Sequence, residues 1–473
     1  MVFSSSLFLF LFLPLFLAAY HLLPFRLRRF WLLAASWVFY GWWRFDFLAL
    51  LLAMSSAAWL LGRWIAASRV TRHARARAFL ALGVALFVGT LAYFKYVNFG
   101  IESVNALWGG LGARAIPLLN VVLPVGISFC TFKAISYLVD IYRGSIDAGG
   151  NWREVALYIA IFPQVISGPI DRYGDLAPQL RRDTRSFEDF GAGALRFMWG
   201  FCKKVLIADA VAPLANAVFA LSRPSLADSW LGAGAYTVQL YFDFSGYTDM
   251  AVGLGLMMGL RFMENFRSPY LSESITEFWR RWHISLSSWL RDYLYFPLGG
   301  SRRGKGRTIL NLLIVMVLGG LWHGAAVTFV LWGAWHGLLL VIERLRRNAK
   351  PIPGFPRPLS IAVTMILVIV GWVLFRAQSL EAAVRMYGGM IGIFGAGLSA
   401  DLRWQIDGMA VAALAVAAAG IYCGPLVAGR LAGLPARRRR VAEGLSLAVF
   451  PLFLLGIVKL VAGSSPLFLY GRF

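Results

Sequence analysis

Residues 309–343 read ILNLLIVMVLGGLWHGAAVTFVLWGAWHGLLLVIE, and the one charged residue of this run, Glu343, comes at its end. Crossing a hydrocarbon core of roughly 30 Å takes about 20 apolar helical residues. Each half of the run, near 309–326 and 327–343, is close to that length. We therefore predict two consecutive membrane-spanning helices, for which the bilayer is the solvent.

The same character continues towards both ends of the chain. Of the 473 residues, 59% are hydrophobic and 15% are charged, whereas a soluble globule carries roughly 25% charged residues. Because apolar runs recur throughout, we predict an all-α, polytopic membrane protein with about 12 spanning helices. The predicted spans lie near 3–23, 30–43, 46–62, 78–97, 118–140, 195–220, 231–259, 309–326, 327–343, 358–377, 408–428 and 443–463. The first lacks a basic n-region and a small-residue cleavage site, so we expect it to be retained.

The net charge is +23, which in a soluble chain would suggest nucleic-acid binding. Here the positive charges gather in short segments beside the apolar runs. These basic segments are 26–29, 63–77, 344–350 and 437–440. Because Arg and Lys in short loops mark the cytoplasmic side, we predict that these loops are cytoplasmic, that both termini are external, and that nucleic acid is not a partner.

The three cysteines, Cys130, Cys202 and Cys423, lie far apart, in or beside apolar runs. They lack the spacing of metal ligands. Free cysteine is also among the residue types most often buried in proteins. We therefore expect three buried thiols and no metal site.

Two segments do not fit simple spanning helices. Segment 161–170 is apolar but contains Pro163, Gly168 and Pro169. Non-helical backbone at membrane depth is tolerated only where it is buried in protein or lines a water-filled cavity, so we predict a re-entrant or interfacial segment that helps to line one. Segment 275–295 has apolar residues at the spacing of an amphipathic helix. We predict a single helix that lies along the cytoplasmic interface.

The chain has five histidines: His21, His73, His283, His323 and His336. His323 lies between Gly320 and Gly324 within a predicted span. An ionisable residue at membrane depth is costly and indicates function by default, and glycines let a ligand or another backbone approach closely. A buried structural histidine is the competing interpretation. We expect His21, His73 and His336 to be interfacial or structural. His283 lies towards the apolar side of 275–295, and the pattern favours equally a packed interfacial residue and part of a functional site.

Residues 241–249, YFDFSGYTD, place Asp243, Ser245 and Asp249 within another predicted span. Removing a carboxylate from water costs several kcal/mol unless the group is paired or hydrated. We therefore expect both carboxylates to face a cavity or a cationic partner. The candidate partners are Asn265, Arg267, Arg280 and Arg281.

Four motifs taken together resemble those of the membrane-bound O-acyltransferases: YFDFSGYTD (241–249), WRRWH (279–283), RDYLYFPLGG (291–300) and LGGLWHG (318–324). The resemblance is to the bacterial branch typified by the alginate O-acetyltransferase membrane subunit, which PVGISF (124–129), FPQ (162–164) and Gly168-Pro169 also resemble. It extends in order from the N-terminus through the 358–377 span. Cys130 and Lys133 depart from the tyrosine and glutamine of that pattern.

The resemblance implies one membrane domain over 1–473, with a motif-bearing core near 118–345 around a central funnel or tunnel. It implies acetyl-CoA as the acyl-donor substrate, arriving from the cytoplasm, and no permanently bound cofactor. The location it implies is the inner membrane of a bacterium. The implied acceptor is a hydroxyl of an alginate-like exopolysaccharide, or an exported, periplasmic acetyltransferase partner that takes the acetyl group.

His323 matches the buried histidine of that family, and His283 matches its second polar position. Neutral imidazole has a pKa near working pH, so we assign His323 as general base towards the acceptor hydroxyl. His283 or a nearby polar group would hold the donor or stabilise the oxyanion. The other residues predicted to bind donor or acceptor are Trp279, Arg280, Arg281, Trp282, Asp243, Ser245, Asp249, Asn265 and Trp322.

Three alternatives stay open at this point. A sister group with similar motifs transfers D-alanine from a carrier protein to a cell-wall polymer, and acylation of a lipid would use the same chemistry. A transporter or flippase, which is a different class, would also show spans, re-entrant segments and intramembrane charge. Transporters often contain repeated halves, and this sequence shows none.

Overall fold

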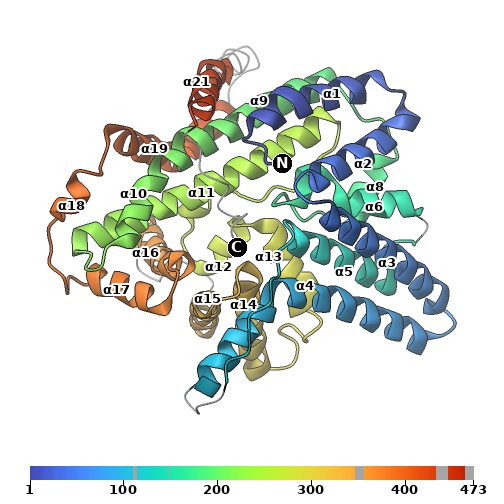
Figure 1. Cartoon of the computed structure of the whole chain (residues 1–473), viewed down its shortest axis with the longest axis horizontal. Coiled ribbons are helices and arrows are strands. Elements are labelled where there is room, and N and C mark those ends of the chain that lie inside the picture. Colours follow the sequence, from blue (N-terminus) through green and yellow to red (C-terminus); the bar gives the residue numbers. More distant parts are fainter. Residues whose placement is uncertain (110–113, 149, 347–355, 433–445, 464–473) are drawn as a thin grey trace. The chain divides into compact units, whose positions relative to one another are not determined.

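The computed structural model describes residues 1–109, 114–148, 150–346, 356–432 and 446–463. All regular elements within them are helices (Figure 1), which confirms the predicted all-α class. The chain divides into two compact units. The first contains 1–194 and 251–263, and the second contains 195–250 and 264–473. Helices α9 (Phe187–Cys202) and α11 (Leu226–Met257) contribute to both units.

The first unit is organised around α3 (Phe45–Arg69), which packs against α4, α5 and α6 (Figure 1). The buried residues of α3 include Leu51, Met54, Ala58 and Leu61, at alternating spacings of three and four residues that place them on one helical face. The other elements of this unit are η1 (Phe8–Phe12), α1 (Leu13–Leu22), α2 (Phe25–Gly41), α4 (His73–Gly109), α5 (Ile127–Arg143), α6 (Trp152–Ala160), α7 (Phe162–Val165) and α8 (Tyr173–Leu180).

The second unit contains the helix pair α14 (Lys305–His323) and α15 (Val327–Leu345), with α12 and α16 packed against α15. Its core includes the buried rings of Trp282, Trp332 and Trp372. The other elements are η2 (Lys203–Ala208), α10 (Asp209–Ala220), η3 (Pro269–Leu271), α12 (Ile275–Arg281), α13 (Ile284–Leu290), η4 (Arg291–Tyr295), α16 (Arg357–Arg376), α17 (Leu380–Met390), α18 (Ala400–Arg403), α19 (Gly408–Ala432), η5 (Ser446–Ala448) and α21 (Val449–Val461).

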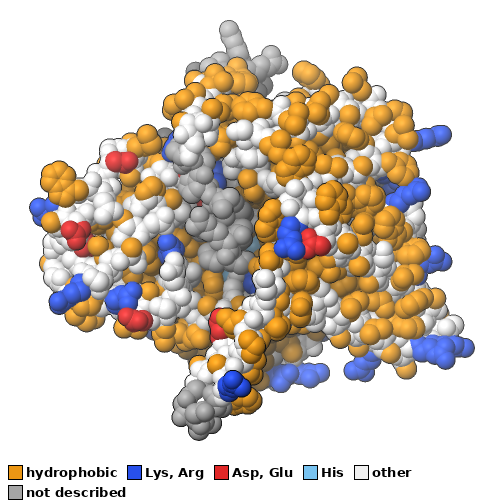
Figure 2. All heavy atoms as spheres, in the orientation of Figure 1, with side chains coloured by type: hydrophobic (Ala, Val, Ile, Leu, Met, Phe, Trp, Pro, Cys, Tyr) orange, Lys and Arg blue, Asp and Glu red, His pale blue; other side chains and the backbone are white. Residues whose placement is uncertain are grey.

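Among the described residues, five helices are long and apolar enough to cross a membrane: α3, α4, α14, α15 and α16. They coincide with the predicted spans near 46–62, 78–97, 309–326, 327–343 and 358–377. Shorter apolar helices occupy 8–22, 408–424 and 449–461. On the face shown in Figure 2, hydrophobic side chains cover much of the first unit, and Lys and Arg side chains gather along its edge. Apart from the span near 118–140, the remaining predicted spans stay predictions.

The predicted span near 118–140 is wrong in its first part. Residues 114–123 contain no helix, and α5 begins only at Ile127. Pro117 and Pro124 disfavour a helix here, and Gly126 has φ 77°. The extended segment is held by α4, because the side chain of Asn98 bonds both the backbone N–H and the carbonyl oxygen of Leu119.

The segment 161–170 is broken, as its prolines predict, and it is buried throughout. Helix α7 ends at Val165. A closed hydrogen-bond network, which we call the Lys133 network, lies beside it. The Lys133 ammonium donates to the carbonyl oxygen of Tyr158 at 2.9 Å and to Oε1 of Gln164 at 2.6 Å. The Gln164 amide donates to Asp171 at 2.6 Å, and the backbone N–H of Met263 donates to the same carboxylate at 2.9 Å.

The predicted burial of the cysteines is confirmed for two of the three. Cys130 and Cys202 are buried, but Cys423 is exposed, because it lies on a side of α19 that the described chain does not cover. The prediction of three buried thiols is therefore wrong for Cys423. Of the basic segments, residues 347–350 and 437–440 lie outside the described residues.

Candidate active site

The helix pair α14–α15 positions His323, which is the last residue of α14. A Cβ atom added to Gly320 would lie 2.2 Å from the carbonyl oxygen of Phe329, and one added to Gly333 would lie 2.3 Å from that of Met316. Any larger residue at either position would force the two backbones apart. The predicted close approach of another backbone is therefore confirmed at Gly320. His323 itself is 4% exposed.

The predicted single helix over 275–295 is wrong. Helices α12 and α13 replace it, followed by the π-helical turn η4. The break lies at His283, which has φ 42° and ψ 55°, a left-handed conformation that His adopts more readily than most side chains. The break turns His283 inward, where it is completely buried. Burial lowers the pKa of His283 to about 3, so its ring is neutral at neutral pH.

Two polar residues hold the broken segment in place. The backbone oxygen of Asn265 accepts from the N–H of Ile284 at 3.0 Å, and its side-chain oxygen accepts from the N–H of Ser285 at 3.1 Å. Glu343 of α15 accepts from the N–H groups of Ile275 and Thr276 at 2.6 and 2.9 Å. Asn265 thus orders the start of α13, and Glu343 caps the first turn of α12, where backbone N–H groups lack partners within the helix.

The two histidines approach each other within a cluster of aromatic rings. Their ring centroids are 6.4 Å apart, and Trp322 packs against both, at 6.0 Å from His283 and 4.9 Å from His323. Phe244 of α11 contacts His283 at 4.7 Å. Trp332 of α15 contacts His323 at 5.2 Å, edge to face. The structure therefore brings together the two residues assigned to catalysis.

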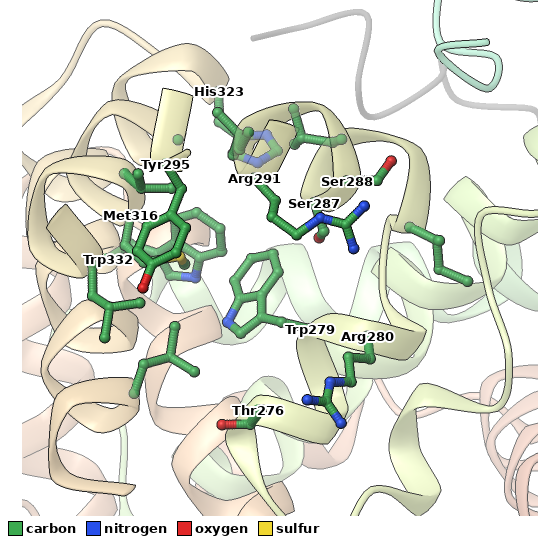
Figure 3. A pocket seen from close by; sticks show the side chains of 17 residues that line it. Thr276, Trp279, Arg280, Ser287, Ser288, Arg291, Tyr295, Met316, His323 and Trp332 are labelled. Atoms are coloured by element: carbon green, nitrogen blue, oxygen red, sulfur yellow. The ribbon is translucent and has the colours of Figure 1, made fainter. Parts of the chain in front are cut away.

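His323 lines a cavity of about 430 Å³, which we call the inner cavity. Figure 3 shows the side chains that surround it, including Trp279, Arg291 and Trp332. Much of the wall is apolar, with Leu286, Leu290, Leu312, Val315, Met316 and Leu340. His323 therefore borders a largely apolar space whose charged side chains are Arg280 and Arg291.

A second cavity of about 600 Å³, the outer cavity, adjoins the first. The two share Thr276, Arg280, Tyr295, Leu312 and Leu340. The outer cavity is lined in addition by Lys305, Arg344 and Glu343. The lining of the outer cavity thus contains three basic side chains, Arg280, Lys305 and Arg344, and one carboxylate, Glu343. That carboxylate already caps α12. The charge of the outer cavity favours an anionic ligand.

The buried carboxylates of α11 have cationic partners, but not the predicted ones. Asp243 pairs with Lys204 at 2.9 Å, and Lys204 also bonds Asp209. Asp249 pairs with Lys203 at 2.6 Å and with Arg196 at 2.9 Å. The interpretation of Arg267, Arg280 and Arg281 as partners is therefore wrong. Both lysines lie on η2 within an apolar run. Because charged side chains in such a run are rare and usually paired, this feature could have identified the two lysines as partners from the sequence.

Some of the predicted binding residues line the inner cavity, and others do not. Trp279 and Arg280 line the inner cavity. Trp282 is buried in the core and Arg281 pairs with Glu277. Ser245 is buried beside Phe244 on α11. The wall residues that the sequence analysis missed include Thr276, Arg291, Tyr295, Met316 and Trp332.

Comparisons with known proteins bear on this site. The family model of the membrane-bound O-acyltransferases matches residues 151–382. The probable alginate O-acetylase of Pseudomonas putida is 52% identical over 420 residues, which cover 88% of this chain and 86% of that protein. That of Azotobacter vinelandii is 51% identical over 419 residues, or 88% and 83% of the two chains. The peptidoglycan O-acetyltransferase of Helicobacter pylori is 34% identical over 433 residues, or 84% and 81%.

Proposed function

This chain belongs to the membrane-bound O-acyltransferase family, and from that premise we propose that it transfers an acetyl group from cytoplasmic acetyl-CoA to an alginate-like exopolysaccharide. The transfer is direct or passes through an exported acetyltransferase partner. The observation that carries the proposal is the position of His323 in a largely apolar cavity that adjoins a basic one. The similarity to probable alginate O-acetylases supports the choice of acceptor.

In the proposed reaction, His323 is the general base. The acceptor hydroxyl oxygen attacks the thioester carbonyl carbon while its proton moves to the imidazole of His323. A new C–O bond forms, and a tetrahedral oxyanion results. The C–S bond then breaks, and His323 returns the proton to the thiolate, so that free CoA and the acetyl ester leave. His283, 6.4 Å away between ring centroids, is a positioning residue whose neutral ring packs beside the base.

The two cavities suit the two ends of the donor. The phosphates of acetyl-CoA would lie in the outer cavity, near Lys305, Arg280 and Arg344, because clustered basic side chains attract and bind phosphate. The pantetheine arm would then run past Trp279 into the inner cavity. This arrangement delivers the thioester to His323.

The test uses purified protein in lipid vesicles with radiolabelled acetyl-CoA and alginate oligosaccharides. Acetylated oligosaccharide and free CoA in equal amounts are the expected products. No turnover of acetyl-CoA, but turnover with a D-alanyl carrier protein, would favour the sister reaction. A lipid-linked label would indicate a lipid acceptor. Movement of a solute without any chemical product would indicate a transporter.

We further propose that both termini are external and that the protein lies in the inner membrane of a bacterium. The supporting pattern is the basic segment 63–77 at the junction of α3 and α4. In a Cys423→Ser background, an impermeant maleimide should label Phe45→Cys in cells with a permeabilised outer membrane. It should label Arg72→Cys only after lysis. Both positions are exposed, and the reverse pattern would overturn this topology.

A further inference from the structure

Packing between α14 and α15 explains three of the four glycines beside His323. A Cβ atom added to Gly320 would meet the carbonyl oxygen of Phe329, and one added to Gly333 would meet the backbone of α14. A Cβ atom added to Gly324 would collide with the Phe329 ring. No side chain fits at any of these positions, so their role is structural.

Gly319, the fourth glycine, has more space around it. In the described part of the chain, apart from its chain neighbours and the α14 backbone, an added Cβ atom would have one heavy atom within 4 Å. That atom is Cδ1 of Leu290, at 3.2 Å. Gly319 and Leu290 both line the inner cavity, so this methyl group has room to move aside. Glycine inside a helix is also less stable than alanine. Packing therefore does not require glycine at position 319, whereas a ligand in the cavity would.

Gly319 precedes His323 by about one helical turn and lies on the same face of α14. The residues of this face all line the inner cavity: Leu312, Val315, Met316, Gly319 and His323. Side chains in a helix lean towards its N-terminus and cover the turn before them, so the imidazole of His323 extends towards the level of Gly319. Leu312 also lines the outer cavity. A donor that enters from there would follow this face towards His323 and pass Gly319.

We propose that the acyl thioester of the donor lies against the backbone of Gly319, and that the missing side chain at this position determines which acyl groups the protein transfers. The inference deepens the proposed function and rests on it. In that reaction the thioester carbon must come within about 3–3.5 Å of the attacking hydroxyl oxygen, while the same hydroxyl bonds the imidazole. Because His323 is only 4% exposed, both substrates share a small opening, and a methyl group beside it would reduce the space.

Leu290 forms the adjoining part of the same wall. It is the last residue of α13. A methyl group at position 319 would push the Leu290 side chain into the inner cavity, whereas truncation of Leu290 to alanine would enlarge the cavity there. The two substitutions should therefore have opposite effects on the size of the acyl group that fits. In combination each should offset the other, because the truncated side chain no longer meets the added methyl group.

The test compares Gly319→Ala, Leu290→Ala and the double variant, with acetyl-, propionyl- and butyryl-CoA as donors. The measured quantity is the kcat/KM for each longer donor divided by that for acetyl-CoA. Because one methylene group in a pocket changes kcat/KM by about tenfold or more, Gly319→Ala should lower the propionyl-to-acetyl ratio by about tenfold. Leu290→Ala should raise the ratio by a similar factor, and the double variant should return it towards wild type. A ratio that is unchanged in Gly319→Ala, or not raised in Leu290→Ala, would overturn the proposal.

Two other glycines of α14 are matched controls. Gly306 is exposed, lines neither cavity, and has open space where a Cβ atom would lie, so Gly306→Ala should leave every ratio unchanged. Gly320→Ala should force α14 and α15 apart and lower the turnover of all donors in equal proportion. A shift of the ratio in Gly320→Ala as large as that in Gly319→Ala would mean that lost packing, and not the wall at Gly319, sets the donor preference.

Two further comparisons keep the test decisive. If Gly319→Ala does not fold, or if the wild type uses propionyl-CoA too slowly to measure, Leu290→Ala is compared with the double variant, in which the neighbour of the added methyl group is gone. Equal ratios in these two proteins would defeat the role of Gly319. Wild-type protein that turns over no acetyl-CoA defeats the proposed function itself, whereas active wild-type protein with unchanged ratios in all variants defeats only this inference.

Discussion

Two buried polar regions, one in each unit, differ in where their hydrogen bonds go. In the Lys133 network of the first unit, an ammonium, an amide and a carboxylate bond to one another and to backbone groups. On the inner cavity wall of the second unit, two indole N–H groups have no partner in the described chain. The first region is closed, whereas the second is open in the sense that it borders the inner cavity.

This difference separates structural polar groups from functional ones. Polar groups buried in a protein are normally hydrogen-bonded, so burial of a charged residue in a span does not by itself indicate a site. The Lys204 group, with Asp209 and Asp243, is a second set of buried charges that pair with one another. A cavity beside buried polar groups is the stronger indication, and in the second unit the inner cavity coincides with His323.

The largest effect is expected for His323→Ala in the open region. Loss of a general base should lower the rate of acetyl transfer by about 10³-fold. The protein should stay folded, because the close approach of α14 and α15 is set by Gly320 and Gly333. The measurement is product formation from labelled acetyl-CoA, together with size-exclusion chromatography in detergent. His73→Ala, at an exposed histidine of α4, is the control. A folded His323→Ala protein with wild-type activity would remove His323 from the reaction.

Much of the open region could be predicted from the sequence. His323 is conspicuous because an ionisable ring between glycines interrupts a long apolar run, and both features are local. Glu343 and Trp332 are not conspicuous. Glutamate at the end of a span is an ordinary boundary residue, and tryptophan in a span is an ordinary core residue. Their roles depend on α12 and on the cavity, which local pattern does not specify.

The break at His283 could not be predicted from hydrophobic periodicity. Trp282 and Leu286 keep the helical spacing across it, and neither Gly nor Pro marks the turn. The prediction of a partner for Asp243 failed for another reason. Two residues in different helices meet through helix packing, and a sequence alone does not state which helices are neighbours.

In the closed region, Lys133→Met should act on stability instead of on rate. It removes an ammonium that donates to Tyr158 and Gln164, and hydrogen bonds of a charged group contribute about 2–3 kcal/mol. We expect the free energy of unfolding, measured by titration with SDS in mixed micelles, to fall by about that amount. The kcat of the protein that remains folded should be near wild type. Lys305→Met, at an exposed lysine, should leave the stability unchanged. A lower kcat at unchanged stability would place Lys133 with the functional groups.

Glu343→Gln tests the boundary between the two kinds of region, because Glu343 lines the outer cavity and also caps α12. Weakening a cap costs about 1 kcal/mol, and the loosened helix carries Trp279 and Arg280. We expect the KM for acetyl-CoA to rise by about fivefold, since about 1.4 kcal/mol is a factor of ten, with a smaller loss in kcat. Glu381→Gln, at an exposed residue of α17, removes the same charge and should change neither constant. An unchanged KM in Glu343→Gln would show that α12 does not need its cap to bind the donor.

The smallest effect is expected for Lys305→Gln, which removes one positive charge from the outer cavity. Lys305 is exposed, and exposed charge pairs contribute about 0.2–1 kcal/mol. The KM for acetyl-CoA should therefore rise by only about 1.4- to fivefold, with kcat unchanged. The effect should shrink as salt is added, because salt screens exposed charges, and it should disappear for a short acetyl thioester that lacks phosphate groups. Arg302→Gln, in the turn that precedes α14 but not on the cavity wall, controls for net charge and should change KM less. Equal effects of both substitutions would mean that general attraction of the anionic donor, and not the outer cavity, accounts for its binding.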